Sequence, residues 1–205
     1  MALVKYNNNS ISAITSTGLT AGAMTLIKEQ TASSSATISF VNGTSDVVLD
    51  STYPIYVFKF INVHPASDQV DFQVNFRDGG SSYDATKTTT MFKAYHDEGD
   101  SDTALGYDTN RDLAQATGVQ PLVFSVGNGN DESASGELWL YNPSSTTYVK
   151  HFMARTNFLY FQNYSIDTFV AGYCNVTAAI DGVQFSMSSG NIDAGTFKLY
   201  GIKDS

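Results

Sequence analysis

Strict alternation of apolar and polar residues over Gln69–Phe76 is the feature that most constrains how this chain can fold. Val70, Phe72, Val74 and Phe76 alternate with four polar residues. Because successive side chains of a β-strand point to opposite faces of its sheet, the segment predicts a strand with one buried and one solvated face. Helical periodicity is almost absent from the rest of the chain, which predicts an all-β protein.

The same alternation recurs in nine further segments. Its apolar positions are Ala36, Ile38 and Phe40; Tyr56, Phe58 and Phe60; Phe92 and Ala94; Leu122, Phe124 and Val126; Leu138 and Leu140; Val149, His151 and Met153; Phe169, Ala171 and Tyr173; Val183, Phe185 and Met187; Phe197 and Leu199. Turn-forming Gly, Asn, Asp and Pro residues separate these segments. About ten evenly spaced strands, without the crossover helices that a parallel sheet needs, predict an antiparallel, jelly-roll-like β-sandwich.

The length of 205 residues predicts one folded domain over residues 23–205, preceded by an extended arm over residues 1–22. With 42% hydrophobic and only 15% charged residues, the domain is far from the composition of a disordered chain. The arm is too weakly apolar for a core strand, which favours ordering by a neighbouring subunit. Its apolar residues are the candidate contacts: Leu3, Tyr6, Ile11, Ile14 and Leu19.

A second segment, residues 96–120, interrupts the strand pattern with a long, polar and acidic connection. Connections of this length are uncommon in compact domains unless they are functional or docked on another part of the structure. Within it, Asp108–Thr117 is a candidate for a short helical turn, with Leu113 facing inward.

The net charge of −9 argues against a polyanionic partner. Binding to nucleic acid depends on Lys and Arg releasing counterions from phosphates, and the 11 basic residues form no stripe. Nucleic acid and anionic membranes are therefore not expected partners. Residues 1–9 contain no apolar core of the kind a secretion signal requires, and the chain has no long apolar run, so we expect a soluble protein made in a cytoplasm.

Few residues have the character of metal ligands. Asp97, Asp100 and Asp102 alternate in an acidic run, and such carboxylates can converge on a hard cation, although the run lacks the spacing of an EF-hand and is more typical of a solvated loop or a subunit contact. The three histidines have none of the paired spacings of a zinc site. Cys174 lies in a strand-like run and is expected to be a small buried hydrophobic residue. We expect no cofactor.

No local signature of catalysis is present. The chain has neither a G-x-S-x-G nor a Walker sequence, which predicts a protein without enzymatic activity. A hydrolase triad whose members meet only in space stays open as an alternative.

Six of the eight aromatic residues between positions 139 and 164 form a candidate cluster. In a domain of this size most are expected in the core, whereas exposed rings would stack on sugars or form interface hot spots. The six are Trp139, Tyr141, Tyr148, Tyr160, Phe161 and Tyr164.

Several stretches of the chain resemble virion structural proteins of marine tailed phages. These stretches are the opening Met1–Ile11, the blocks Ser51–Tyr56 and Ile61–Ala66, the block Ala94–Asp102, and Met187–Thr196; the closing Gly195–Ile202 looks like the last strand of many phage fibre and decoration domains.

The resemblance implies a virion component with a jelly-roll-like domain, forming a homotrimer and assembled in the host cytoplasm. It implies no catalytic residues. Two roles follow from it: an accessory capsid protein, of the decoration or cement kind, in contact with the major capsid protein, or a tail or fibre component that binds a receptor such as a host surface glycan.

Overall fold

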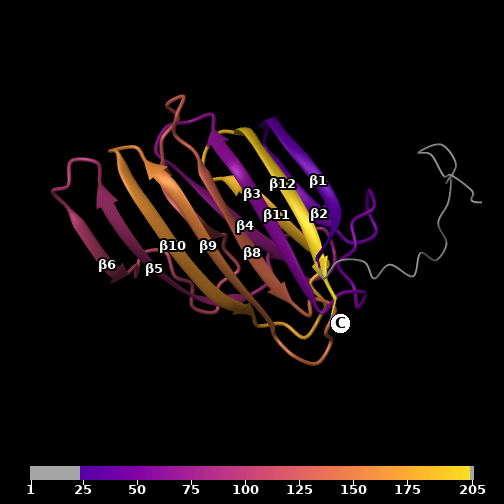
Figure 1. Ribbon diagram of the computed structural model, residues 1–205. Coiled ribbons are helices and arrows are strands. Elements are labelled where there is room, and N and C mark those ends of the chain that lie inside the picture. The colour runs from indigo at the N-terminus through magenta and orange to yellow at the C-terminus, as the bar shows by residue number, and fades with distance from the viewer. Residues whose placement is uncertain (1–23, 204–205) are drawn as a thin grey trace, which may run out of the picture.

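Residues 24–203 are described by a computed structural model, and within this range the protein consists of β-strands and connections without a helix (Figure 1). The strands are β1 (Met24–Ser35), β2 (Thr37–Val41), β3 (Ile55–Pro65), β4 (Val70–Arg77), β5 (Lys87–Asp97), β6 (Thr103–Tyr107), β7 (Gln120–Val126), β8 (Ala134–Tyr141), β9 (Lys150–Tyr160), β10 (Tyr164–Cys174), β11 (Gly182–Met187) and β12 (Ile192–Ile202). The predicted arm over residues 1–22 lies outside the described residues.

All paired strands are antiparallel and belong to one sheet that is nearly closed into a barrel. One path runs β6-β5-β10-β9-β8-β3-β12-β1, and a second runs β7-β4-β11-β2. The paths meet at a single pair, Val126 with Tyr160. At the opposite side β1 approaches β2, where Gln30 Nε2 donates a hydrogen bond to the carbonyl oxygen of Ser39 at 2.9 Å.

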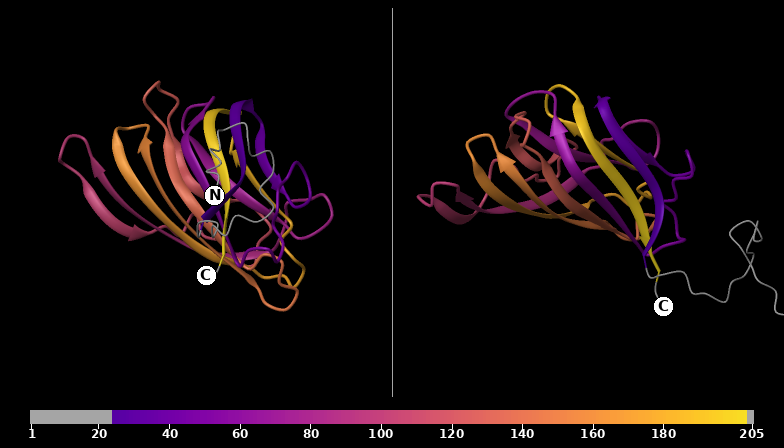
Figure 2. Two further views of the ribbon diagram at one scale, coloured as in Figure 1. Left: turned by 45° about the vertical axis from the view of Figure 1, so that its right-hand side comes forward. Right: turned by 45° about the horizontal axis from the view of Figure 1, so that its top comes forward.

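Strand β9 is a branch point, because it pairs with β8 along one edge, with β10 along the other and also with β7 at Tyr160. Nine strands therefore form a ring, closed except between β1 and β2, and three strands extend from it. We call β10, β5 and β6 the wing; β5 and β6 project to one side of the body in Figure 2. The all-β, antiparallel prediction is confirmed, with twelve strands in place of about ten.

The two strands that the alternation did not identify are edge strands. β6 is exposed at every position, and the second half of β1 is almost entirely polar. An edge strand that buries little apolar surface has no alternation to read, so its pairing depends on the neighbour rather than on its own sequence.

The long connection is also more structured than predicted. Its first part forms the β5–β6 hairpin, and the helical turn predicted over Asp108–Thr117 is wrong. The backbone there bonds mainly to β5: the Thr89 N–H donates to the carbonyl oxygen of Leu113 at 2.8 Å, and Lys87 and Ala116 exchange two hydrogen bonds of 2.9 and 3.0 Å. These long-range pairings replace the local ones that a helix would need.

The core of the ring is built from phenylalanines on facing strands. Six rings that are at most 1% exposed pack with centroids 5.2–6.0 Å apart, mostly edge to face or tilted. They are Phe58 and Phe60 of β3, Phe197 of β12, Phe40 of β2, Phe72 of β4 and Phe185 of β11. Each lies at an apolar position of the sequence alternation, which identified this core correctly.

Two lysines are also fully buried, which the sequence did not indicate. Lys87 Nζ donates to the carbonyl oxygens of Ala85, Thr117 and Gly118 at 3.0, 3.4 and 2.7 Å. Burial lowers the pKa of Lys87 to about 8. The ammonium group satisfies three carbonyl oxygens and so fixes the connection before β7 against the start of β5.

Lys150 plays the same part at another connection, donating to the carbonyl oxygens of Ser145, Tyr148 and Val176. Cys174 pairs with both lysines across the sheet and is fully buried, as predicted. Burial raises the pKa of its thiol to about 12, so the thiolate that would react is scarcely populated.

Three neighbouring strands bury the face opposite to the one that the alternation singled out. In β9 the buried side chains are Phe152 and Ala154, while Met153 is exposed. In β5, Met91 is buried and Phe92 is 41% exposed.

The pairing register explains this reversal. Leu138 of β8 lies in the core, and it pairs with Ala154, which pairs with Val170 and through it with Met91. Paired residues share one face of a sheet, so the buried position of Leu138 fixes the inward residues of the next three strands. Phe92, Met153 and the other alternate residues are consequently turned outward.

Candidate functional site

The outward side of the eight-strand path, here called the outer face, carries an unbroken row of paired residues. One residue from each strand belongs to it, from β1 to β6: Glu29, Lys198, Lys59, Glu137, Arg155, Phe169, Phe92 and Tyr107. We call this set the cross-strand row. Its first five members are charged and its last three aromatic, so its two ends differ in chemistry.

The charged part of the row is neutralised when Asp167, which lies beside it on the same face, is included. Lys198 Nζ lies 3.0 Å from Glu29 Oε2, and Lys59 Nζ lies 3.7 Å from Glu137 Oε2. The remaining cation, Arg155, is bound to Asp167 on the same face at 2.7 Å. Three carboxylates and three cations leave the outer face without net charge at this row, so the −9 of the chain lies elsewhere.

The aromatic part of the row lies mainly on the wing. The rings of Phe169 and Phe92 stack with centroids 4.7 Å apart and planes inclined by 5°. The Arg155 guanidinium lies 4.8 Å from the Phe169 centroid, a cation–π contact at the boundary between the two parts of the row. Beyond Phe92, Tyr107 and Leu105 of β6 are 52% and 73% exposed.

A second row of the outer face adds Trp139 of β8 and Met153 of β9. Trp139 donates its indole N–H to Glu137 Oε1 at 2.9 Å, which fixes the ring on the surface. With Phe92 and Phe169, these residues line a shallow hollow of about 320 Å³ whose walls are mostly apolar. A surface of this kind is typical of a contact with another molecule.

The outer face collects most of the exposed apolar surface of the described residues. Of nine large apolar side chains that are strongly exposed, seven lie on it: Met24, Leu26, Ile61, Phe92, Leu105, Tyr107 and Met153. Single exposed hydrophobic residues are ordinary, but a concentration on one sheet face marks a candidate interaction surface.

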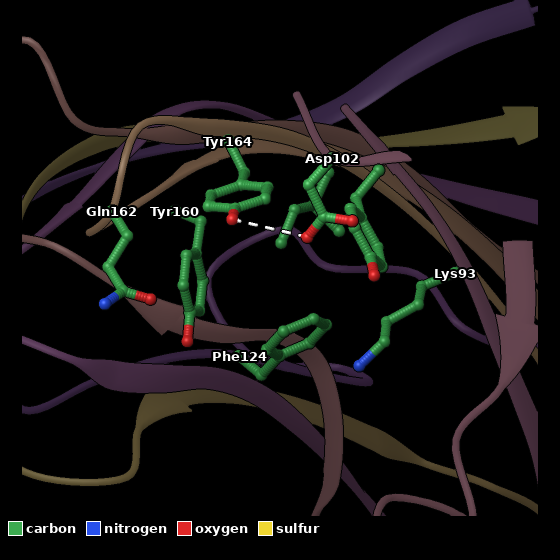
Figure 3. A pocket seen from close by; sticks show the side chains of 8 residues that line it. Lys93, Asp102, Phe124, Tyr160, Gln162 and Tyr164 are labelled. Carbon is green, nitrogen blue, oxygen red and sulfur yellow. Dashed lines mark hydrogen bonds between the residues drawn. The ribbon is translucent and has the colours of Figure 1, made fainter. Parts of the chain in front are cut away.

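A separate pocket opens on the opposite side of β5 and β10 (Figure 3). Lys93 and Tyr95 of β5 alternate with the outward Phe92 and Ala94, so they point away from the outer face. The pocket has a volume of about 200 Å³. It is lined by Lys93, Tyr95, Asp102, Phe124, Tyr160, Gln162, Tyr164 and Ile166, and we call it the tyrosine pocket.

Aromatic rings at steep angles to one another form the walls of the tyrosine pocket. The ring of Tyr164 lies 5.9 Å from that of Tyr160 at 88° and 5.7 Å from that of Tyr95 at 70°. Phe124 of β7 closes the lower side in Figure 3, 5.9 Å from Tyr160 at 61°. Edge-to-face packing holds the rings against each other and gives the pocket aromatic walls.

An ion cluster around the buried Asp108 supports the floor of the pocket. Lys93 Nζ and Arg111 Nη1 each lie 3.0 Å from Asp108 Oδ2, and both cations lie over the ring of Phe124. Burial of Asp108 would raise its pKa, but the Lys93 hydrogen bond and the charges of Arg111 and Lys93 outweigh it, so this pKa lies below its ordinary value. The carboxylate is therefore ionised and holds both cations in place.

The polar groups at the rim are only partly engaged. Tyr164 donates its hydroxyl to Asp102 at 3.4 Å, the one hydrogen bond among the eight lining side chains (Figure 3). Burial, followed by the charge of Asp102, raises the pKa of Tyr164. The hydroxyls of Tyr95 and Tyr160 and the amide of Gln162 are free of partners within the lining.

The predicted metal ligands take other roles. Asp97 accepts hydrogen bonds from the Ser101 hydroxyl and from the N–H groups of Ser101 and Asp102, and the first of these contributes most to lowering its pKa to about 2. Asp100 lies 3.1 Å from His96 Nε2, and Asp102 lines the tyrosine pocket. Within residues 24–203 no group of three or more His, Cys, Asp or Glu side chains is arranged to hold a metal ion.

The aromatic cluster predicted to be mostly core is not: none of its six members is fully buried. Trp139 and Tyr141 lie on the outer face, Tyr160 and Tyr164 line the tyrosine pocket, Phe161 packs on Tyr160, and Tyr148 is 72% exposed in a connection. The register of β8, β9 and β10 determines which of these residues face outward and which face the pocket. The alternation alone does not predict that register. The candidate arm contacts Leu3, Tyr6, Ile11, Ile14 and Leu19 lie outside the described residues and stay predictions.

Comparison with protein-family models, with curated proteins and with solved structures gave no match to this chain. The part of the chain that the structure describes contains no helix long and apolar enough to cross a membrane.

Proposed function

We propose that this chain is a structural protein of a tailed-phage virion: an accessory capsid protein, of the decoration or cement kind, that stabilises the particle through subunit contacts. The observation that carries the proposal is the uncovered outer face, with its aromatic wing and its neutral row of charges. The resemblance of the sequence to virion proteins of marine tailed phages supports the same assignment.

The charge distribution favours a second copy of the chain as the partner of the outer face. Two copies that each carry −9 repel one another over most of their surfaces. At the cross-strand row this repulsion is absent, because its carboxylates and cations balance. Apolar area that leaves water contributes about 25 cal/mol per Å², so the face is the surface on which copies gain most by meeting.

We propose a homotrimer with a jelly-roll-like sandwich as its subunit. In this arrangement β7, β4, β11 and β2 cover the inner side of the eight-strand path, around the phenylalanine core. A three-fold axis in front of the outer face lets each copy bury part of it against both neighbours and shields the exposed edge at β6. The arm over residues 1–22 would then anchor the trimer to the major capsid protein.

A non-enzymatic role agrees with the state of the carboxylates on the outer face. Glu137 and Asp167 line one hollow, the arrangement that a glycosidase would need. Both are already engaged: Glu137 with Lys59 and Trp139, and Asp167 with Arg155. We therefore assign these groups to the surface and not to a reaction.

The tyrosine pocket favours a second candidate function, that of a tail or fibre component that binds a receptor. Its aromatic walls and free hydroxyl groups face away from the outer face, so a trimer leaves them accessible. Images of particles that contain the chain distinguish the two roles by its position: on the capsid for the first, on the tail for the second.

Sedimentation of the full-length chain tests the contact. We expect the mass of three chains, and we expect Met153→Glu to yield single chains, since it places a carboxylate in the centre of the outer face. Tyr148→Glu is the control, because Tyr148 is at least as accessible as Met153 but lies off this face. A wild-type chain that sediments as a monomer at every concentration overturns the proposal.

A further inference from the structure

We infer that the tyrosine pocket binds a neutral hexopyranose, as the terminal unit of a glycan. The inference goes beyond the structural role, because the pocket lies on the opposite side of β5 and β10 from the outer face. It stands on the shape of the pocket, on its balance of charges and on the polar groups left free at its rim.

The walls suit a flat ligand with apolar faces. Tyr160, Tyr164, Tyr95 and Phe124 line the space with rings at 61–88° to their neighbours, so a ligand there contacts aromatic carbon on several sides. A pyranose presents C–H groups on its faces and hydroxyl groups around its edge. Tyrosine, with an apolar body and a polar tip, complements both.

The charged side chains of the lining and of its floor sum to zero, and Asp97 adds a negative charge beside Tyr164. Lys93 and Arg111 share the single carboxylate of Asp108, which leaves one positive charge at the floor. Asp102 at the rim supplies one negative charge. A phosphate, sulfate or acidic sugar would face Asp102, and a cationic ligand would face Lys93, so a neutral ligand is preferred.

Both donors and acceptors are available at the rim. The hydroxyls of Tyr95 and Tyr160 can each donate and accept, the Gln162 amide does both, and Asp102 only accepts. Sugar hydroxyl groups also donate and accept. These rim groups therefore favour binding of a polyhydroxylated ligand. A purely apolar ligand would leave them without hydrogen-bond partners.

The size limits the ligand to one ring. At about 200 Å³ the pocket is smaller than the roughly 300–1,000 Å³ of sites for drug-sized molecules. A ligand of this size, with few atoms in contact, binds weakly, with a Kd on the order of 1 mM. Tight attachment would come from several pockets acting together in an oligomer.

The test is saturation-transfer NMR on the full-length chain with the methyl pyranosides of glucose, galactose and mannose. We expect transfer to at least one of them, and a loss of at least tenfold in affinity for Tyr160→Ala. Tyr160→Phe, which keeps the ring and removes the hydroxyl, should retain part of the binding. Tyr148→Ala, at an exposed residue outside both the pocket and the outer face, is the control and should bind as the wild type does.

Asp102→Asn tests the charge balance without removing a wall. It removes the negative charge of Asp102 from the rim and keeps the positive charge at the floor, so we expect the methyl glycoside of glucuronic acid to gain at least fivefold in affinity while neutral sugars change little. Absence of transfer from all neutral sugars, or equal binding by Tyr160→Ala with an unchanged amide spectrum, overturns the inference. Either result leaves the sedimentation test untouched, so failure here is distinguishable from failure of the structural role.

Discussion

Two stacked phenylalanine pairs show how differently the ring and the wing use the same side chain. In the ring, Phe72 and Phe185 stack at 5.7 Å and 16°, and both are 0% exposed. In the wing, Phe92 and Phe169 stack at 4.7 Å and 5°, yet Phe92 keeps 41% of its surface accessible. The first pair is completely covered by other residues of the same chain. The second has a partner on one side only, which leaves apolar surface for another molecule to cover.

Truncating one phenylalanine of each pair should give the largest difference in unfolding free energy between the ring and the wing. Phe72→Ala removes a ring from a closed core and should cost about 3–5 kcal/mol of unfolding free energy. Phe92→Ala should cost less than about 1 kcal/mol in the dissociated chain, because most of what it removes is already exposed. Urea unfolding at low protein concentration measures both, and equal losses would erase the distinction between ring and wing.

The lysines extend the comparison to charged groups. Lys87→Met deletes an ammonium that satisfies three carbonyl oxygens and should cost about 2–4 kcal/mol. Lys59→Met, on the outer face, breaks only an exposed pair and should cost less than about 1 kcal/mol. Hydrogen exchange should show a loss of amide protection around Thr117 and Gly118 in Lys87→Met but not in Lys59→Met. Unchanged protection there would mean that Lys87 does not fix this connection.

A smaller effect should appear with pH. Since the pKa of Lys87 is about 8 in the folded chain and near 10.5 when unfolded, the unfolded chain binds more protons between these values. Unfolding free energy should therefore rise with pH in that window, by about 1 kcal/mol from pH 8 to pH 9. The pH dependence of unfolding free energy should be measured for the wild type and for Lys87→Met. The difference between the two isolates the contribution of Lys87 from that of Cys174. A flat difference would show that Lys87 titrates normally.

The sequence predicts the ring far better than the wing, for one physical reason. Alternation identifies the buried face when the other face is polar, as in Gln69–Phe76. In β9, β10 and β5 both faces carry large apolar groups, so the alternation alone does not show which face is buried. Only the register with Leu138 decides between them, and register is a property of the assembled sheet.

The sites follow the same rule. Tyr160 and Tyr164 are conspicuous in the sequence, but their meeting with Asp102 and Phe124 depends on pairing between distant strands. The burial of Lys87 was equally unreadable, since the carbonyl oxygens that hold it belong to a connection without a pattern. Local sequence therefore predicts strands and turns here, and the long-range pairing determines the surfaces.

Thiol labelling measures most directly whether the outer face is covered in the assembled protein. Met153→Cys places a thiol at the centre of that face, Tyr148→Cys places one off it, and the native Cys174 is buried with a pKa of about 12, so it should scarcely react. Full coverage predicts alkylation of Met153→Cys at least tenfold slower than that of Tyr148→Cys in the oligomer, with the two rates converging on dilution to single chains. Equal rates at both concentrations would contradict the claim that sister subunits occupy the outer face.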